Sequence, residues 1–140
     1  MEKPDIRWIQ RFSNFKKALA KLGAVADEKQ VSDLSELEQE GLIRRFESTH
    51  ELAWKTLQDL LKYRGYLGIT GPKPVLSQAF QDGLIADGEA WSLMSEARNS
   101  SSHTYDSARA EEIAENIIET YYDLFRDLEK RLDTERNSNP

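Results

Sequence analysis

The residues best suited to chemistry lie in one stretch, WSLMSEARNSSSHTY, which runs from Trp91 to Tyr105. Its first part has the apolar spacing of a helix, and a polar run begins at Arg98. In a continuous helix Arg98 and His103 would point about 140° apart, but the serines after Asn99 compete for backbone hydrogen bonds and favour a break. We therefore expect Arg98, His103 and Tyr105 to converge in one pocket. The Asn99 amide and the serine hydroxyls add donors to this set, which is suited to binding anions and transferring protons.

The composition is that of one ordinary globular domain. The chain has 140 residues, of which 31% are charged and 39% are hydrophobic. It contains no cysteine, which excludes disulfides, thiolate metal sites and cysteine nucleophiles. No apolar run approaches the roughly 18 residues of a membrane span, and the amphipathic segment from Met1 to Lys17 is unlike a signal peptide. We expect a cytoplasmic protein with no membrane association.

The net charge of −6 restricts the nucleic-acid contacts that this chain could make. Proteins that bind nucleic acid non-specifically carry an evident basic field, so any RNA contact here is expected to be local. Small basic clusters, interpreted as solvated helix faces, are Lys16, Lys17 and Lys21; Arg44 and Arg45; Lys62 and Arg64. An acidic surface suits a protein partner at least as well.

Apolar residues recur three and four positions apart along much of the chain, which is typical of amphipathic helices. The first stripe consists of Trp8, Phe12, Phe15, Leu19 and Leu22. The second consists of Leu34, Leu37, Leu42, Phe46, Ala53, Leu57 and Leu60. A short third stripe consists of Leu76, Ala79 and Phe80, and the last of Ile113, Ile117, Tyr121, Leu124, Leu128 and Leu132.

Turn and capping residues divide this pattern into five helices. We expect them from Asp5 to Gly23, from Leu34 to Tyr63, from Pro74 to Gly83, from Asp87 to Arg98, and from Asp106 or Ser107 to residue 134. Gly23 is expected to end the first helix, and Gly41 marks a weak point or a close-packing position in the second. Asp87 is the expected cap of the fourth helix. The loop from Arg64 to Lys73 follows no strand, so its glycines are neither a dinucleotide fingerprint nor a phosphate-binding loop.

The fold class predicted from these helices is all-α. No stretch alternates apolar and polar residues over a useful length, which argues against a sheet. We expect an up-down antiparallel bundle of about five helices, with a single domain at 1–134 and a frayed tail at 135–140. Because the apolar and aromatic stripes offer more surface than one small bundle buries, we also expect a homodimer.

The chain has only two histidines, and their surroundings differ. His50 lies between Phe46 and Ala53 on the apolar face of the second helix and is interpreted as a packed core residue. His103 stands outside any apolar stripe, beside hydroxyl groups and five residues after an arginine. His103 is therefore the candidate for chemistry.

The carboxylates offer no further site. Glu47, Glu51 and Lys55 follow one another at four-residue spacing, which indicates surface ion pairing. The acidic residues between Asp82 and Glu89 flank a turn rather than share a helical face, so we expect neither a metal nor a cofactor.

The polar motif has the form arginine, four residues, histidine, one residue, tyrosine, and it resembles the signature of HEPN-superfamily domains. The motif positions are taken by Arg98, Asn99, His103 and Tyr105. Two further segments, GLIRRFESTHELAWKTLQDLL at 41–61 and AFQDGLIADGEAW at 79–91, look like the nucleotidyltransferase substrate-binding protein family. That family is a HEPN branch related to the HepT toxins.

The resemblance implies a dimeric bundle in which Arg98 and His103 of both chains share one cleft. Arg45, Glu47 and Trp54 are the residues that could border this cleft. The resemblance also implies a separately encoded minimal nucleotidyltransferase, similar to the MntA antitoxins, as partner. Two functions follow from it: a metal-independent ribonuclease toxin, or a non-catalytic subunit that binds substrate and presents it to the nucleotidyltransferase.

The chemistry of RNA cleavage fits the first function. Cleavage without metal needs a base for the 2′-hydroxyl proton, an acid for the leaving 5′-oxygen and a cation beside the phosphorane. A dimer offers two imidazoles of ordinary pKa, about 6.5, so His103 is assigned as general acid and base and Arg98 as the phosphate clamp. Asn99 is assigned to orient either group. An inert helical scaffold is disfavoured because it leaves the polar motif without a purpose.

Tyr105 has two expected roles. It contacts substrate in the shared cleft, and in HepT-like systems the partner silences the toxin by adenylylating the tyrosine of the motif. An adenylyl group at Tyr105 would fill the cleft and repel RNA phosphate, which is a direct mechanism of inactivation.

Overall fold

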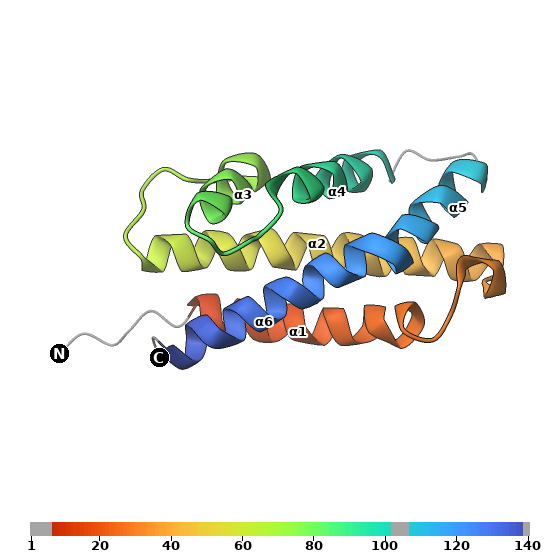
Figure 1. Ribbon diagram of the computed structural model, residues 1–140, viewed down its shortest axis with the longest axis horizontal. Coiled ribbons are helices and arrows are strands. Elements are labelled where there is room, and N and C mark those ends of the chain that lie inside the picture. The colour runs from red at the N-terminus through yellow and green to blue at the C-terminus, as the bar shows by residue number, and fades with distance from the viewer. Residues whose placement is uncertain (1–6, 102–106, 139–140) are drawn as a thin grey trace.

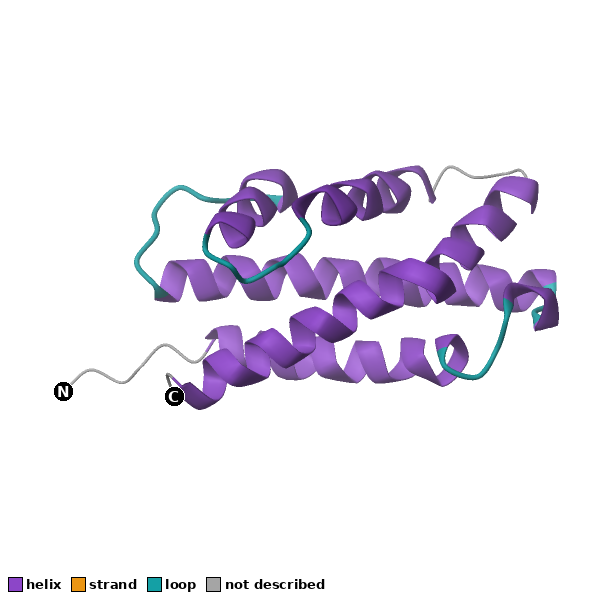
Figure 2. Cartoon of the chain, viewed as in Figure 1, coloured by secondary structure: helices purple, strands orange, loops and turns teal. Residues whose placement is uncertain are grey.

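The computed structural model of this chain describes residues 7–101 and 107–138. They contain helices and connecting loops and no strand, so the predicted all-α class is confirmed (Figures 1 and 2). The elements are α1 (Arg7–Ala26), a 3-10 turn η1 (Val31–Asp33), α2 (Glu36–Tyr63), α3 (Pro72–Gln81), α4 (Gly88–Ser101), α5 (Ser107–Asn116), a π-helical turn η2 (Ile117–Tyr121) and α6 (Tyr122–Ser138). Within these ranges no helix combines the length and apolarity needed to cross a bilayer.

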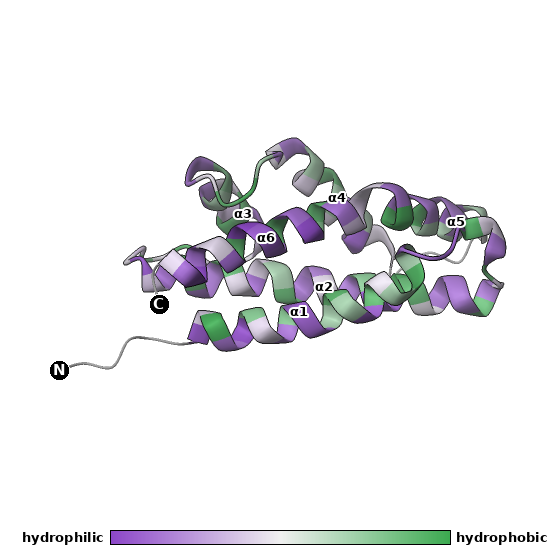
Figure 3. Cartoon of the chain, turned by 60° about the horizontal axis from the view of Figure 1, so that its bottom comes forward, coloured by the Kyte–Doolittle hydropathy of each residue, from purple (hydrophilic) through white to green (hydrophobic). Residues whose placement is uncertain are grey.

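The helices run alternately up and down the molecule. Helices α1 and α2 lie antiparallel, and α4 runs back along α2. The nearly continuous helix from α5 to α6 then crosses over α2 and α1 (Figure 1). Helix α2 contacts α1, α3, α4 and α5, so it is the central element of the bundle. Apolar and polar residues alternate along the helices, as amphipathic packing requires (Figure 3).

Aromatic side chains from four helices meet in the core. Phe125 of α6 lies with its ring centroid 6.1 Å from that of Phe15 and 6.1 Å from that of Phe46. Trp91 of α4 packs edge-on against Phe125 at 5.8 Å. These contacts fix α4 against the rest of the bundle and so set the position of the polar residues at its end.

Helix α1 continues past Gly23, where it was expected to stop. Gly23 is buried because Tyr122 of α6 packs over it, and a Cβ at this position would lie 2.5 Å from the Tyr122 hydroxyl oxygen. That hydroxyl donates a 2.8 Å hydrogen bond to Asp27 Oδ2. Gly23 is therefore a close-packing residue. Gly41 is neither a break nor a close-packing residue, since α2 continues through it and a Cβ there would meet no atom within 4 Å.

Helix α2 begins at Glu36, two residues later than expected, because Ser35 caps it. The Ser35 hydroxyl accepts from the backbone N–H of Glu38, and the Glu38 carboxylate accepts from the backbone N–H of Ser35, at 3.1 and 2.9 Å. Leu34 is buried just outside the helix, whereas Leu37, which was placed on the apolar stripe, is 77% exposed.

The start of α4 was predicted correctly, whereas the start of α3 was not. Helix α3 begins at Pro72 rather than Pro74, and Phe80 of its expected stripe is half exposed. The predicted cap of α4 is confirmed, since Asp87 Oδ1 accepts a 3.0 Å hydrogen bond from the backbone N–H of Ala90.

The C-terminal helix differs from its prediction in two ways. The π-helical turn η2 adds a residue to one turn, so Phe125 rather than Leu124 becomes fully buried. The tail expected to fray from residue 135 is helical to Ser138. Glu135 is buried between Arg64 and Arg131; the pair with Arg64 holds the last turn against the end of α2, and the pair with Arg131 lies within α6.

Candidate functional site

Helix α4 carries the first half of the polar motif as regular helix. The break expected at Arg98 does not occur, and the helix continues to Ser101. The serines do bond to the backbone, but to carbonyl groups of the preceding turn: Ser100 Oγ lies 3.1 Å from the Ala97 oxygen, and Ser101 Oγ lies 2.9 Å from the Arg98 oxygen. Such bonds fit inside a helix, which is why the serine run does not end it.

Arg98 faces a carboxylate of the central helix. Its Nη1 lies 4.0 Å from Glu47 Oε2, and the two side chains are 31% and 24% exposed. Ser101 Oγ lies 2.7 Å from the same Glu47 oxygen, so its single proton is shared between this carboxylate and the Arg98 carbonyl oxygen. Glu47 is therefore fixed by Ser101 and holds the guanidinium at the surface, where a solvent-borne anion can still reach it.

The next turn of α2 extends this polar cluster. Glu51 accepts a hydrogen bond from Trp54 Nε1 at 3.2 Å and pairs with Lys55 at 2.9 Å. Burial works to raise the Glu51 pKa, but the hydrogen bonds and the charges of Lys55 and Arg98 outweigh it and lower the pKa. The predicted surface ion pair of Glu51 and Lys55 is confirmed. Glu47 contacts Arg98 and Ser101 of α4 instead.

His50 is a core residue, as predicted, and also joins α2 to α4. It is 3% exposed, and its Nε2 lies 2.9 Å from Ser95 Oγ. Burial, followed by the positive charge of Arg98, lowers the His50 pKa to about 4 against the smaller opposing effect of Glu51. The imidazole is therefore neutral at pH 7 and is unsuited to act as a general acid there.

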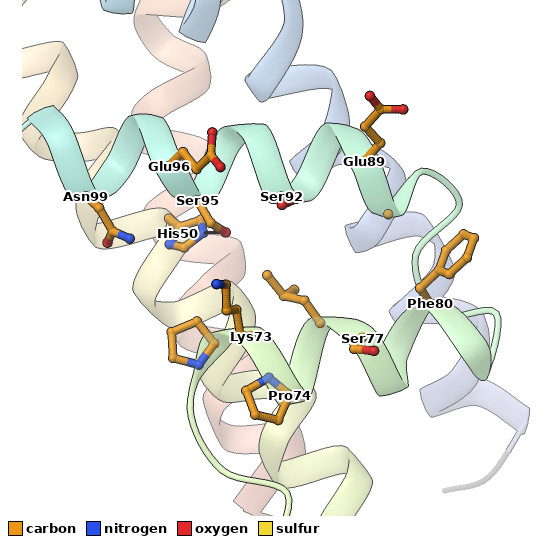
Figure 4. Close-up of a pocket in the computed structure, with 13 residues that line it drawn as sticks. His50, Lys73, Pro74, Ser77, Phe80, Glu89, Ser92, Ser95, Glu96 and Asn99 are labelled. Atoms are coloured by element: carbon orange, nitrogen blue, oxygen red, sulfur yellow. Dashed lines mark hydrogen bonds between the residues drawn. The ribbon is translucent and has the colours of Figure 1, made fainter.

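A pocket of about 760 Å³ opens between α2, α3 and α4 beside this cluster. Ser95 and Asn99 line it from α4, His50 from α2, and Lys73 and Phe80 from α3 (Figure 4). Its volume is within the usual range for small-molecule sites, and it combines one cation and two carboxylates, Glu89 and Glu96, with hydroxyl and amide groups and an aromatic ring. Among the described residues, no group of three His, Asp or Glu side chains is placed to hold a metal ion.

The predicted site residues are only partly brought together. Arg98, Glu47 and Trp54 belong to one cluster across α2 and α4, and Asn99 lies at the adjacent pocket. Arg45 does not join them, because it points toward α1 and donates a 2.8 Å hydrogen bond from Nη1 to the Lys21 carbonyl oxygen.

The remaining motif residues, His103 and Tyr105, lie outside the described residues. The predicted convergence of these two side chains with Arg98 therefore stays a prediction. Helix α4 and α5 border this segment on either side, at Ser101 and Ser107.

Sequence reasoning missed the polar face of α4. Ser92, Ser95 and Asn99 all line the pocket, and they stand three and four positions apart in the sequence. That spacing is the helical signature of a polar stripe. Ser92 and Ser95 lie within the helix predicted from Asp87 to Arg98, so this spacing could have revealed the stripe.

The helices and their polar cluster define a small all-α bundle protein with a cationic site at the end of α4. The chain belongs to the family described as nucleotidyltransferase substrate binding protein like, whose model matches residues 10–134. The family predicted from the three sequence segments is thus confirmed.

Named relatives agree with this family. The chain is 35% identical over 74 residues to the probable ribonuclease HepT of Haemophilus influenzae. The match covers 50% of this chain and 51% of the relative, so the chain spans about half the length of that curated relative.

Two solved structures share the fold. The crystal structure of ttk003001694 from Thermus thermophilus is 32% identical with a TM-score of 0.74, covering 84% of this chain and 98% of that one. HI0074 from Haemophilus influenzae is 24% identical with a TM-score of 0.64, covering 90% of this chain and 96% of that one. HI0074 is described as the fold of a substrate-binding domain of a nucleotidyltransferase, and at this identity the likeness concerns the fold alone.

Proposed function

We propose that this protein is a metal-independent endoribonuclease of the HepT kind. The observation that carries the proposal is Arg98, a partly exposed cation held by Glu47 at the end of α4, directly before the segment that contains His103. The 35% identity to a probable ribonuclease HepT supports it. A guanidinium in this position binds a phosphodiester and stabilises the charge of its transition state.

The reaction is a transesterification between neighbouring groups of the RNA. One His103 takes the proton of the 2′-hydroxyl, whose oxygen attacks the phosphorus while the bond to the 5′-oxygen breaks. A second His103 gives its proton to that leaving oxygen, and the products carry a cyclic phosphate and a 5′-hydroxyl. Two imidazoles are needed, so the active form is a homodimer with Arg98 and His103 of both chains at one cleft.

Regulation comes from a minimal nucleotidyltransferase of the MntA kind. We infer that it transfers the adenylyl group of ATP to Tyr105: the phenol oxygen bonds to the α-phosphorus, the bond to pyrophosphate breaks, and pyrophosphate leaves. This adds a bulky, negatively charged group beside the phosphate site. The family description, which associates the family with nucleotidyltransferases, supports such a partner. Intact mass after co-expression tests this step: an adenylyl increment is expected on the wild type and is expected to be missing from Tyr105→Phe.

The decisive activity experiment is RNA cleavage in EDTA. The wild type is expected to cleave, and His103→Ala and Arg98→Ala are each expected to lose at least 100-fold, in line with the usual contribution of one general acid-base or oxyanion-binding group. Equal cleavage by wild type and His103→Ala would remove the proposal.

A second candidate function is favoured by the pocket of about 760 Å³ between α2, α3 and α4. In this function the protein is non-catalytic and binds a nucleotide that it presents to the nucleotidyltransferase. Lys73 on α3 would meet the phosphates, and the Asn99 amide would meet the base or sugar. ATP binding lost in Lys73→Glu but kept in Lys62→Glu, together with no RNA cleavage at high protein concentration, would favour this function over the first.

A further inference from the structure

A second concave surface lies in the groove between α1 and α2. It encloses about 680 Å³. Four cations, Lys17 and Lys21 of α1 with Arg44 and Arg45 of α2, line it. Residues from two sequence clusters that were interpreted as separate solvated faces thus line one basic groove, which contains no carboxylate among its lining residues, while Lys16 of the first cluster pairs with Asp133 instead.

Most arginines elsewhere in the described chain are paired with a carboxylate, whereas the four cations of this groove are not; Arg126 lies over the Tyr122 ring instead. Six arginines lie within ion-pair distance of a carboxylate: Arg11, Arg64, Arg98, Arg109, Arg131 and Arg136. No such pair involves the four groove cations within residues 7–101 and 107–138, and Arg45 instead bonds to a backbone carbonyl. In a protein of net charge −6, this concentration of unpaired positive charge is a local attraction for an anion.

The groove is also close to the Arg98 cluster along the chain of α2. Arg44 stands three residues before Glu47, so the two side chains are neighbours on the surface of one helix. Gly41 forms part of the floor, and because it has no side chain the groove is open there. An extended polymer bound at Arg98 could therefore continue past Arg44 into the groove.

We propose that this groove binds the phosphate backbone of single-stranded RNA and guides it to the cluster of Arg98 and Glu47. RNA as the ligand rests on the proposed function. The lining favours a polyanion, since four cations line the groove with no carboxylate among them, and the groove contains no aromatic residue or methionine of the kind that the centres of protein interfaces favour. Asn14 and Ser48 add neutral donors for phosphate oxygens.

Gly41 provides a matched test that leaves the fold intact. Gly41→Glu and Gly41→Gln introduce side chains of equal size at a helical position where a Cβ meets no atom within 4 Å, and both residues favour a helix more than glycine does. Binding is measured with a 2′-deoxy single-stranded oligonucleotide, which lacks the hydroxyl needed for cleavage. Gly41→Glu is expected to weaken binding at low salt by about three- to tenfold relative to Gly41→Gln, from repulsion by one added charge. Equal binding by the two variants overturns the proposal.

Salt dependence gives the second measurement. Removing Lys17, Lys21 and Arg44 together as alanines is expected to reduce the slope of log affinity against log salt by about 2, at about 0.7 per lost phosphate contact. The matched control removes the exposed Lys29, Lys62 and Lys130 and is expected to keep the slope. Equal slopes in both triple variants overturn the proposal. So does a groove variant that no longer binds the nucleotidyltransferase but still binds the oligonucleotide.

Failure of the proposed function is distinguishable from failure of this inference. If neither the wild type nor any variant cleaves RNA but Gly41→Glu still weakens oligonucleotide binding, the groove binds nucleic acid and the protein is not a nuclease. If the wild type cleaves RNA, and Gly41→Glu binds and cleaves long RNA as well as Gly41→Gln does, the protein is a nuclease whose groove does not guide RNA.

Discussion

Glu47 and Arg98 face each other across α2 and α4, with 4.0 Å between Glu47 Oε2 and Arg98 Nη1. The same Glu47 oxygen accepts the hydrogen bond of Ser101 at 2.7 Å, so the carboxylate is oriented from one side and acts on the guanidinium from the other. This places a negative charge behind the proposed phosphate clamp. We propose that the role of Glu47 is to position Arg98 rather than to contact substrate.

Glu47→Gln tests this positioning. The amide keeps the size of the side chain and can still accept from Ser101, but it no longer attracts Arg98. Because both side chains are partly exposed and the pair is long, we expect a loss of only about two- to fivefold in kcat for RNA cleavage, with little change in stability. Glu40→Gln, an exposed carboxylate on the same helix, is the control and should cleave like the wild type. Identical rates for the two variants would show that Glu47 does not position Arg98.

His50 should give the fold a pH dependence of its own. Burial opposes the charged imidazole and lowers its pKa from the ordinary value of 6.5 to about 4 in the folded chain. Between these values the unfolded chain binds a proton that the folded chain does not, so stability is complete above about 6.5 and falls as the pH drops toward 4. The full loss has an upper limit of roughly 3 kcal/mol.

Urea unfolding of wild type and His50→Gln at several pH values measures this loss. The glutamine does not titrate, so between pH 6.5 and 5 its stability should depend less steeply on pH than that of the wild type. Carboxylates with a lowered pKa, such as Glu51, make stability depend on pH below their ordinary pKa of 4.5, so they do not affect the range from pH 5 to 6.5. Parallel curves in the window would mean that the folded chain protonates His50 as readily as the unfolded one.

Two glycines should respond in opposite directions to the same substitution. Gly23→Ala would place a Cβ 2.5 Å from the Tyr122 hydroxyl and displace the ring that bonds to Asp27, so we expect a loss of about 1–3 kcal/mol. Gly41→Ala meets no atom within 4 Å and should gain about 0.5–1 kcal/mol from helix propensity. Thermal or urea unfolding of the two variants measures both effects, and a loss at Gly41 would contradict the packing described for α2.

The apolar stripes were predictable from the sequence because local periodicity reports burial directly. Phe12, Phe15 and Phe46 are all fully buried as predicted. Gly23 could not be interpreted correctly in this way, since a glycine that ends a helix and a glycine that admits a tyrosine from another helix have the same local sequence. Tyr122 lies about a hundred residues away in the chain, and only the packed structure brings it over Gly23.

The candidate site was predictable in its residue types but not in its arrangement. Arg98 and Glu47 were both singled out, yet their pairing depends on the rotation of α4 relative to α2, which the core contact of Trp91 with Phe125 sets. Arg45 points toward α1 for a different, local reason. It is two residues from Glu47, and residues so spaced point to different sides of a helix.

The ends of the RNA products test the central claim most directly. Purified protein in EDTA is incubated with a defined RNA, and the fragments are identified by mass. The proposed transesterification at Arg98 and His103 predicts a 2′,3′-cyclic phosphate on one fragment and a 5′-hydroxyl on the other, and no fragments from His103→Ala. Fragments that carry a 3′-hydroxyl and a 5′-phosphate, or an RNA left intact by the wild type, would contradict it.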